Sequence, residues 1–458
     1  MGKRIMILEV SQKQAYIFAS RKLKENCERS QQIADVTGKA FFKDAWPRFS
    51  EGNMVYSGGG HSVVQFDDVD SANSFARAVT FQALKSFPGM ELYVTQIAYN
   101  ERLTPQENLL ELTKALEQKK ARRQQSFRQI FPNGVPLYTA MQARKSEFPP
   151  APHGWSWTND VNRIAGEDHF LAVVHLDGNS MGKRVQKIYD KYGKSWDSCR
   201  EKLQLFSEEI DKHFAESFDE MIQDLVSWLE EKKWPKRTIP VRKLIGAGDD
   251  VCFITRGIFG LECAASFLDH LRQKVNLADG QHYSACAGVV MIHTTAPFRQ
   301  AYDLSESLCK NAKIFVAENG GDFDALDYHI EFGQIKNALS EIQDNLQAED
   351  GSVMSLRPLA LSDRVQMERR YDYFTFLLRN LQEKADALPH SKLKALRTAF
   401  QQGEIEAELA MRMSETKSKL TMDGSIKVYF DDAEGRRCSY YDPIEMMDHV
   451  QLWRKESK

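Results

Sequence analysis

The chain has 458 residues, of which 42% are hydrophobic and 27% charged, and a formal net charge of −3. This length predicts two to four domains, and the composition is that of a soluble globular protein. The small net charge excludes a global attraction to nucleic acid, although a local basic patch stays open, and no apolar segment approaches the roughly 20 residues of a membrane span. The 7 cysteines form no C-x-x-C pair. That pattern predicts reduced thiols in a cytoplasmic protein and argues against a zinc knuckle.

Strands and helices alternate in the first part of the chain. Residues 4–10 are expected to form a buried strand rather than a signal segment, because Glu9 interrupts the apolar run too early. The elements predicted next are two helical segments, a hairpin with a glycine-rich turn, a helix, a strand and a long basic helix, at residues 13–24, 31–42, 54–66, 71–87, 92–99 and 105–131. Asp70 or Ser71 is the expected N-cap of the single helix before the strand.

A stretch rich in proline, glycine and tryptophan, residues 131–159, lacks periodicity and is expected to connect two domains. The pattern then restarts with a strand, helical segments, a hairpin, a helix, a strand and a helix, at residues 170–176, 184–232, 241–255, 260–275, 283–293 and 297–318. The region after Gly320-Gly321 is predicted to be largely helical, with a hairpin candidate at 426–441 and a last helix.

The two parts repeat one order of elements, which indicates an internal duplication. Each β-α-β-β-α-β unit is expected to form a four-stranded antiparallel sheet with helices on one face. The predicted fold class is therefore α+β, with two ferredoxin-like domains followed by a helical C-terminal domain. The copies differ at one turn, where Asp249-Asp250 of the second copy corresponds to Gly60-His61 of the first, and Asp177 corresponds to Glu9 or a neighbour. The second copy is therefore predicted to be active and the first inactive.

Acidic residues end two apolar strands of the second copy. Asp177 follows the strand at 170–176, and Asp249 and Asp250 lie in a hairpin turn. If these strands are neighbours, the carboxylates meet at one edge of the sheet and repel one another unless a cation lies between them. Mg²⁺ suits carboxylates combined with substrate phosphates. The alternative is that these residues only cap a helix or form a turn.

Phosphate-binding residues are expected beside the acids. Glycines in the turns let the backbone approach a bulky anion. Lys313, in the helix that begins near Pro297, is a candidate for binding phosphate, and a solvated helix end is the alternative. Lys183 and Arg184 are weaker candidates of the same kind.

These motifs together resemble the large palm-domain subunit of type III CRISPR effector complexes, the Cas-ten or Cmr-two type. Residues 177–183 (DGNSMGK) are similar to its first catalytic turn, and residues 247–250 (AGDD) to its Gly-Gly-Asp-Asp hairpin. Residues 284–290, with Pro297 and Ala312-Lys313, resemble the strand and helix that follow. The inactive first palm of the family is matched in a similar way by residues 14–24 and 56–60.

The resemblance implies a domain organisation. Residues 1–135 correspond to a degenerate first palm domain, 136–164 to a connector, 165–330 to an active palm domain with a helical insertion around 184–235, and 331–458 to a mainly helical C-terminal domain. Asn179 stands where the family often has a second Asp, and Ala247 replaces the first glycine of the hairpin. The HD nuclease domain and the zinc insertion of many family members are not expected in this sequence.

Three sets of site residues follow from the resemblance. Catalysis and metal binding are expected of Asp177, Asp249 and Asp250. Nucleotide binding is expected of Gly178, Asn179, Ser180, Met181, Gly182, Ala247, Gly248 and Lys313. The acceptor side of the first palm is expected to present Ser57, Gly58, Gly59 and Gly60.

The function implied is conversion of ATP into a cyclic oligoadenylate messenger in antiviral defence, with two Mg²⁺ or Mn²⁺ ions. The implied partners are a nucleoside triphosphate and RNA or other effector subunits, without a membrane, and a homo-oligomer stays open. Two alternatives remain. One is a non-catalytic nucleotide- or RNA-binding palm scaffold, and the other is a cyclase that makes a single cyclic mono- or dinucleotide.

Overall fold

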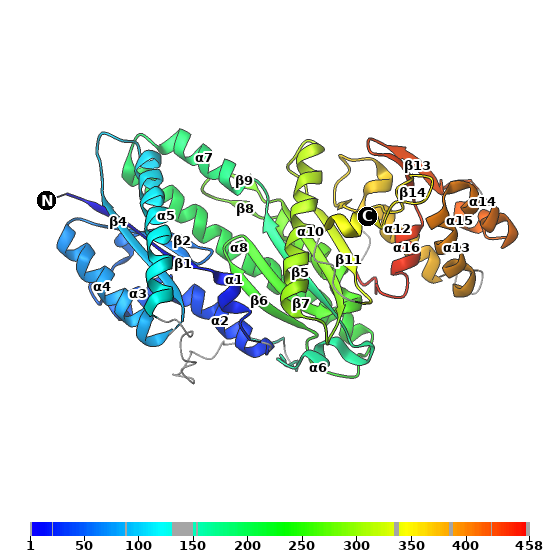
Figure 1. The fold of residues 1–458 in the computed structure, drawn as a ribbon, viewed down its shortest axis with the longest axis horizontal. Helices are drawn as coiled ribbons and strands as arrows, with labels where there is room; N and C mark the ends of the chain where they lie inside the picture. The colour runs from blue at the N-terminus through cyan, green and yellow to red at the C-terminus, as the bar shows by residue number, and fades with distance from the viewer. Residues whose placement is uncertain are drawn as a thin grey trace.

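A computed structural model describes residues 2–20, 22–87, 89–130, 150–152, 154–333, 339–383, 388–422 and 424–454. Two sheets and a helical C-terminal region follow one another along an elongated molecule (Figure 1). Most of the connector predicted at 136–164 lies outside the described residues. Within the described ranges, no helix is both long and apolar enough to cross a membrane.

The first sheet is antiparallel throughout, with the strand order β2-β3-β1-β4. Its strands are β1 (Arg4–Ser11), β2 (Met54–Gly58), β3 (His61–Phe66) and β4 (Glu91–Ala98). Its helices are α1 (Lys13–Ile17), α2 (Leu23–Val36), α3 (Lys39–Ala45), α4 (Val69–Ser86) and α5 (Pro105–Ile130), and the 3₁₀ turn η1 (Glu51–Asn53) precedes β2. The predicted four-stranded antiparallel unit is confirmed for this copy.

Two local predictions in this unit were wrong. The helix expected at 31–42 is divided, because Gly38 adopts an extended conformation between α2 and α3 and glycine is a poor helix former. The N-cap of α4 is Asp68 rather than Asp70 or Ser71, and its carboxylate accepts a hydrogen bond from the Ser71 backbone at 2.7 Å. The helix therefore begins two residues earlier than predicted.

The second sheet has six strands in the order β12-β11-β10-β5-β7-β6, so the expected four strands were too few. Its strands are β5 (Phe170–Gly178), β6 (Val241–Ala247), β7 (Asp250–Arg256), β10 (Ala285–His293), β11 (Ala325–Ile330) and β12 (Leu359–Ala360). The added strand β11 is parallel to β10, and α10 (Phe298–Glu318) makes the crossover between them. Parallel neighbours require such a crossover, which here also carries Lys313.

The remaining elements of this unit include the inserted helices. They are α6 (Val161–Ala165), η2 (Gly166–Asp168), α7 (Met181–Tyr192), α8 (Trp196–Glu231), η3 (Gly257–Phe259), α9 (Gly260–Arg272), β8 (Val275–Asn276) and β9 (Gln281–His282). The C-terminal region contains α11 (Leu339–Asp344), η4 (Met367–Arg369), α12 (Tyr371–Glu383), α13 (His390–Gln402), α14 (Glu404–Met413), α15 (Lys417–Thr421), β13 (Tyr429–Asp432), β14 (Gly435–Cys438) and α16 (Tyr441–Met446). The predicted C-terminal hairpin is confirmed as β13 and β14.

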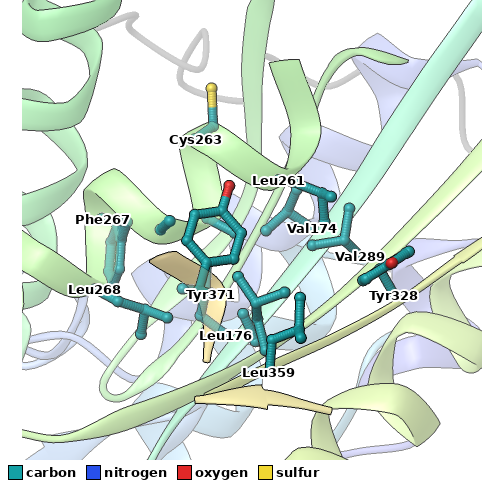
Figure 2. Packing of buried hydrophobic residues seen from close by; sticks show 14 of the residues in the cluster. Val174, Leu176, Leu261, Cys263, Phe267, Leu268, Val289, Tyr328, Leu359 and Tyr371 are labelled. Atoms are coloured by element: carbon teal, nitrogen blue, oxygen red, sulfur yellow. The ribbon is translucent and has the colours of Figure 1, made fainter. Parts of the chain in front are cut away.

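Helices cover both faces of each sheet, which corrects the prediction of a single covered face. Neighbouring residues of β1 enter different cores, with Ile7 in one cluster and Leu8 in the other. On the second sheet, α9 and α12 pack over Val174 and Leu176 on one face (Figure 2). The opposite face, which carries Val173, packs against α10. Side chains alternate along a strand, so each sheet needs a covering layer on both sides when both sets are apolar.

Candidate active site between the two sheets

The predicted neighbours β5 and β7 lie side by side and antiparallel. Their register places Asp177 directly opposite Asp250 at the end of both strands. Asp249 lies in the turn before β7, where Gly248 adopts φ +68°, a conformation that glycine tolerates best. The Asp249 carboxylate lies over Gly178, since a Cβ on that glycine would be 3.2 Å from Asp249 Oδ2. Three carboxylates therefore gather at one edge of the sheet.

The electrostatics of this edge show that the carboxylates are not neutralised by the protein. Burial, together with the charge of Asp177, raises the pKa of Asp249 to about 6 and that of Asp250 to about 7. Lys313 pairs with Asp177, and its Nζ lies 2.7 Å from Asp177 Oδ2 and donates to the Gly178 carbonyl at 2.8 Å. Lys13 also acts on Asp250, yet the pKa values of Asp249 and Asp250 stay raised, so an additional cation is electrostatically favoured here.

The carboxylates here suit a magnesium ion whose coordination shell is completed by oxygens of water and substrate. Asp250 Oδ1 is buried without a hydrogen-bond partner, and the imidazole nitrogen His175 Nδ1, 3.7 Å away, is also without one. Burial lowers the pKa of His175, which favours the neutral ring. In the described part of the chain, no group of three His, Cys, Asp or Glu side chains forms a complete metal site. Mg²⁺ commonly uses only one or two carboxylates and takes its other ligands from water and phosphate oxygens. Asp177 and Asp250, with Asp249 beside them, meet that requirement.

The predicted nucleotide-binding residues after Asp177 occupy different environments. Asn179 is buried, and its side chain donates to the Phe323 carbonyl at 3.0 Å, so this amide supports the turn rather than facing the acids. Ser180 is the left-handed residue (φ 58°) before α7, and Met181 is partly buried against the core. A Cβ on Gly182 would meet open space. Among these residues, Gly178 has the clearest contact with the acids, through Asp249 and Lys313.

The two hairpin turns meet across the space between the sheets. A Cβ on Gly248 would lie 3.5 Å from the backbone nitrogen of Gly59, so the AGDD turn, in which Ala247 pairs with Asp250, faces the first sheet's glycine turn. Gly59 and Gly60 have φ values of 57° and 76°. A cavity of about 480 Å³ opens beside them, lined by Gly59 and Gly60 on one side and by Asp250 and Tyr302 on the other. The first sheet's glycine turn and Asp250 therefore line one cleft.

Helix α8, which had been predicted only as an insertion, binds both turns. Ser207 Oγ donates to the Ser57 carbonyl of the first turn. One helical turn further on, Asp211 accepts a hydrogen bond of 2.7 Å from the Gly248 backbone in the second. Sequence reasoning missed both contacts because no local pattern links α8 to turns so far away in the chain.

Other residues near the acids were also missed. Lys13 lines the cavity, and its Nζ donates to the Gly59 carbonyl. Gln14 Nε2 donates to Glu306 Oε2 at 2.9 Å, a contact that joins α1 of the first unit to α10 of the second. The side-by-side placement of α1 and α10 depends on how the two sheets pack. A single sequence does not reveal that packing.

Comparisons with known proteins support the identity of the second unit. Residues 170–319 match the family described as Cas10/Cmr2, second palm domain. No curated protein matches the chain. A solved Csm1-Csm4 cassette in complex with cA3 is similar at a TM-score of 0.61 and 12% identity, covering 98% of this chain and 70% of that chain. The structure of Csm1 in T. onnurineus has a TM-score of 0.59 and 12% identity, with the same coverage of 98% and 70%. Residues 170–319 thus match the second palm domain of the Cas10/Cmr2 family, within a chain that has the fold of Csm1.

Proposed function

We propose that this chain is a Mg²⁺-dependent nucleotidyltransferase that joins ATP into a cyclic oligonucleotide. The observation that carries the proposal is the meeting of Asp177, Asp249 and Asp250 at the cleft where the first palm's glycine turn faces them. Similar cassette structures are in complex with cA3, with cA4 or with one ATP, which supports ATP as the substrate and a cyclic oligoadenylate as the product. Type III CRISPR effector subunits and RNA are the partners we propose.

Asp177 and Asp250, with Asp249, would hold the ions. When bound, two Mg²⁺ ions acidify the attacking ribose hydroxyl and neutralise the leaving pyrophosphate. In the transfer, the hydroxyl oxygen of an acceptor nucleotide bonds to the α-phosphorus of ATP, and the bond from that phosphorus to the bridging oxygen of pyrophosphate breaks. The hydroxyl proton leaves to solvent, and Asp250 stays ionised as a ligand of the ions. Lys313 supplies positive charge for the triphosphate beside Gly178.

The acceptor nucleotide is placed on the first palm, at Ser57, Gly58, Gly59 and Gly60. This placement is supported by the contact between the two turns and by the cavity that both palms line. Linking nucleotides, in contrast to hydrolysing them, requires a second nucleotide in line with the first. The shared cleft gives that second nucleotide a surface of its own.

The test is product analysis. The purified protein is incubated with ATP and Mg²⁺ or Mn²⁺, and the products are sized by mass spectrometry. We expect cyclic oligoadenylate from the native chain and a loss of at least about 1,000-fold in the Asp249→Ala, Asp250→Ala double variant, because two of the carboxylates that would hold the Mg²⁺ ions are removed. Asp190→Ala, an exposed acid on α7, is the control and should retain activity. Unchanged turnover in the double variant would refute the proposal.

A non-catalytic nucleotide-binding scaffold is the second candidate. It is favoured by one observation, the ion pair between Lys313 and Asp177, which already occupies one of the carboxylates. Calorimetry that shows nucleotide binding, together with no product after a long incubation, would establish this alternative.

A further inference from the structure

The turn that follows β5 is supported by the neighbouring strand β10. Ala285 of β10 lies opposite Gly178, and the Asn179 backbone nitrogen donates to the Ser284 carbonyl at 2.8 Å, one position beyond the last strand pair. Both contacts follow directly on Asp177. The backbone at these residues therefore sets where the end of β5 places the Asp177 carboxylate.

Two buried side chains extend this support to the segment before β11. The Asn179 side chain is buried, and its amide donates to the Phe323 carbonyl at 3.0 Å. The next residue, Asp324, is 4% exposed, and its carboxylate accepts a hydrogen bond of 2.8 Å from the Ala285 backbone. The ladder between β10 and β11 begins at Cys286, directly after that amide, so the carboxylate supplies an acceptor where the strand pair ends. These contacts join the turn, β10 and β11 to one another.

Asp324 is itself fixed from the side of the C-terminal region. Its backbone carbonyl accepts a hydrogen bond of 2.8 Å from the Leu361 amide, and Arg272 Nε of α9 lies 3.4 Å from its Oδ2. Arg272 in turn donates to the Leu361 carbonyl at 3.0 Å and to Asp269. The Asp324 carboxylate is therefore held between an arginine and the backbone of β10, and removing it would leave a buried donor without its acceptor.

We propose that Asn179 and Asp324 are positioning residues, which hold the end of β5 so that Asp177 meets Asp250 across the strand pair. The Asn179 amide, which the sequence predicted to bind nucleotide, is used instead to hold the turn. Residues that orient metal ligands from outside contribute about 10- to 100-fold to metal affinity. The inference rests on the proposed function for the ions that Asp177 and Asp250 would hold, but it can be tested without catalysis.

The first test is binding of Mn²⁺, which takes the same oxygen ligands as Mg²⁺, to the full chain without nucleotide, measured by calorimetry. Asn179→Ala and Asp324→Ala should each weaken Mn²⁺ binding by about tenfold, because each loosens the strand end that carries Asp177. Asp324→Asn should weaken it less than about threefold, because an amide oxygen still accepts from the Ala285 backbone. If Asn179 bound the nucleotide directly, Asn179→Ala would leave this nucleotide-free affinity unchanged.

The second test is hydrogen exchange of the metal-free chain, which reports on the turn without any ion. Asn179→Ala and Asp324→Ala should speed exchange in the peptide that covers residues 177–181 by about tenfold or more, because its local opening becomes easier. Asp442→Ala is the matched control, since it removes a buried carboxylate that accepts from the Leu356 backbone at 2.7 Å in the C-terminal region. It should leave that exchange and the Mn²⁺ affinity unchanged, even though it destabilises the chain.

The outcomes separate this inference from the proposed function. Absence of product or of Mn²⁺ binding in the native chain would refute the proposed function, and the exchange of residues 177–181 would still decide the inference. Unchanged exchange in both Asn179→Ala and Asp324→Ala would overturn it. An Asp324→Asn variant that binds Mn²⁺ as weakly as Asp324→Ala would also overturn it, because the charge and not the hydrogen bond would then be responsible. Thermal unfolding checks that each variant is folded, and Asp324→Asn supplies a variant of nearly unchanged shape.

Discussion

Asp250 is the residue whose surroundings show most clearly that the site favours a bound cation. Its carboxylate lies at a strand end beside two other acids and has one oxygen without a hydrogen-bond partner. Carboxylates in such surroundings hold protons more tightly than they do in water, since burial and like charges both disfavour the ionised form. Holding these acids together therefore lowers the free energy of unfolding of the metal-free protein, and a bound cation would raise it again.

The pH dependence of stability follows from this arrangement. The pKa values of Asp249 (about 6) and Asp250 (about 7) are raised above the ordinary aspartate value of 3.8. Between about pH 4 and 7 the folded chain therefore holds protons that the unfolded chain has lost. Stability in EDTA should therefore fall as pH rises through this window. Asp250→Asn should reduce this loss of stability with rising pH and should stabilise the metal-free protein at pH 8. The gain should be no more than about 1 kcal/mol, because solvent screens the partly exposed carboxylate.

The measurement is denaturant unfolding in EDTA at pH 5 and pH 8. Adding Mg²⁺ at pH 8 should stabilise the native chain and leave Asp250→Asn nearly unchanged. A native chain that is equally stable at both pH values would contradict the expected repulsion, provided that the control Asp190→Asn behaves like the native protein.

Lys313 is expected to act on the substrate rather than on the fold. Lys313→Met removes the charge next to Asp177 and Gly178 but keeps the apolar stem. We expect kcat/KM for ATP to fall about 100-fold, because a charge-assisted contact to phosphate is worth about 3 kcal/mol in a partly dry site. Lys310→Met, which removes an exposed lysine of the same helix, should change it less than threefold. Steady-state measurement of kcat/KM for ATP in both variants tests this role, and an equal effect of the two substitutions would contradict it.

At the scale of elements, α8 sets the separation of the two hairpin turns. It contacts the Ser57 carbonyl through Ser207 and the Gly248 backbone through Asp211. In Figure 1, α8 runs from the first sheet toward the second, in line with its contacts to both. Because the turns face each other, a helix that holds both fixes the width of the cleft between the palms.

Asp211→Ala tests this role. The variant leaves the Gly248 amide without its acceptor, and because the group is near solvent the loss of stability should be below about 1 kcal/mol. Turnover should fall about tenfold, since Asp249 follows directly in the turn. Asp211→Asn retains an acceptor oxygen and should recover most of the activity. Glu208→Ala, which removes a contact from α8 to Lys39 instead, is the control. Equal turnover of Asp211→Ala and the native chain would refute the role.

Local patterns predicted most of these elements but not how they assemble. Strand alternation and glycine turns located both hairpins, and the repeat identified equivalent strands. The strand β11 was missed because its partner β10 is parallel to it and is reached only through α10. Asn179 was expected to bind nucleotide, yet its amide donates to the Phe323 carbonyl, a residue 144 positions away. Such contacts are decided by tertiary packing, which neither periodicity nor residue spacing records.

At the scale of the molecule, one core continues from the first palm into the C-terminal region. The same cluster includes Ile7, Phe253 and Trp453. A buried carboxylate fixes the far end of this core, since Glu262 of α9 accepts hydrogen bonds from the Tyr371 hydroxyl at 2.7 Å and from the backbone of Trp453 and Arg454 at 3.0 and 2.8 Å. The C-terminal region is therefore tied to the palm by polar as well as apolar contacts.

Glu262→Ala should destabilise the whole molecule by about 3 kcal/mol or more, because three donors lose their acceptor in a buried site. Glu262→Gln should cost less, because an amide oxygen still accepts. Denaturant unfolding followed by tryptophan fluorescence and circular dichroism would measure both variants. Asp372→Ala, which removes an exposed acid from the first turn of neighbouring α12, should cost less than about 1 kcal/mol, because it loses one local hydrogen bond from the Tyr373 backbone. A loss below about 1 kcal/mol in Glu262→Ala would contradict this account.

The place of α8 in the chain also bears on ancestry. The helix lies between β5 and β6, inside the second copy of the duplicated unit, yet Ser207 holds the turn of the first copy. Once an insertion in one copy supports the other, neither can be lost or exchanged alone. The two copies are linked through this helix, although only the second carries acids at its hairpin turn.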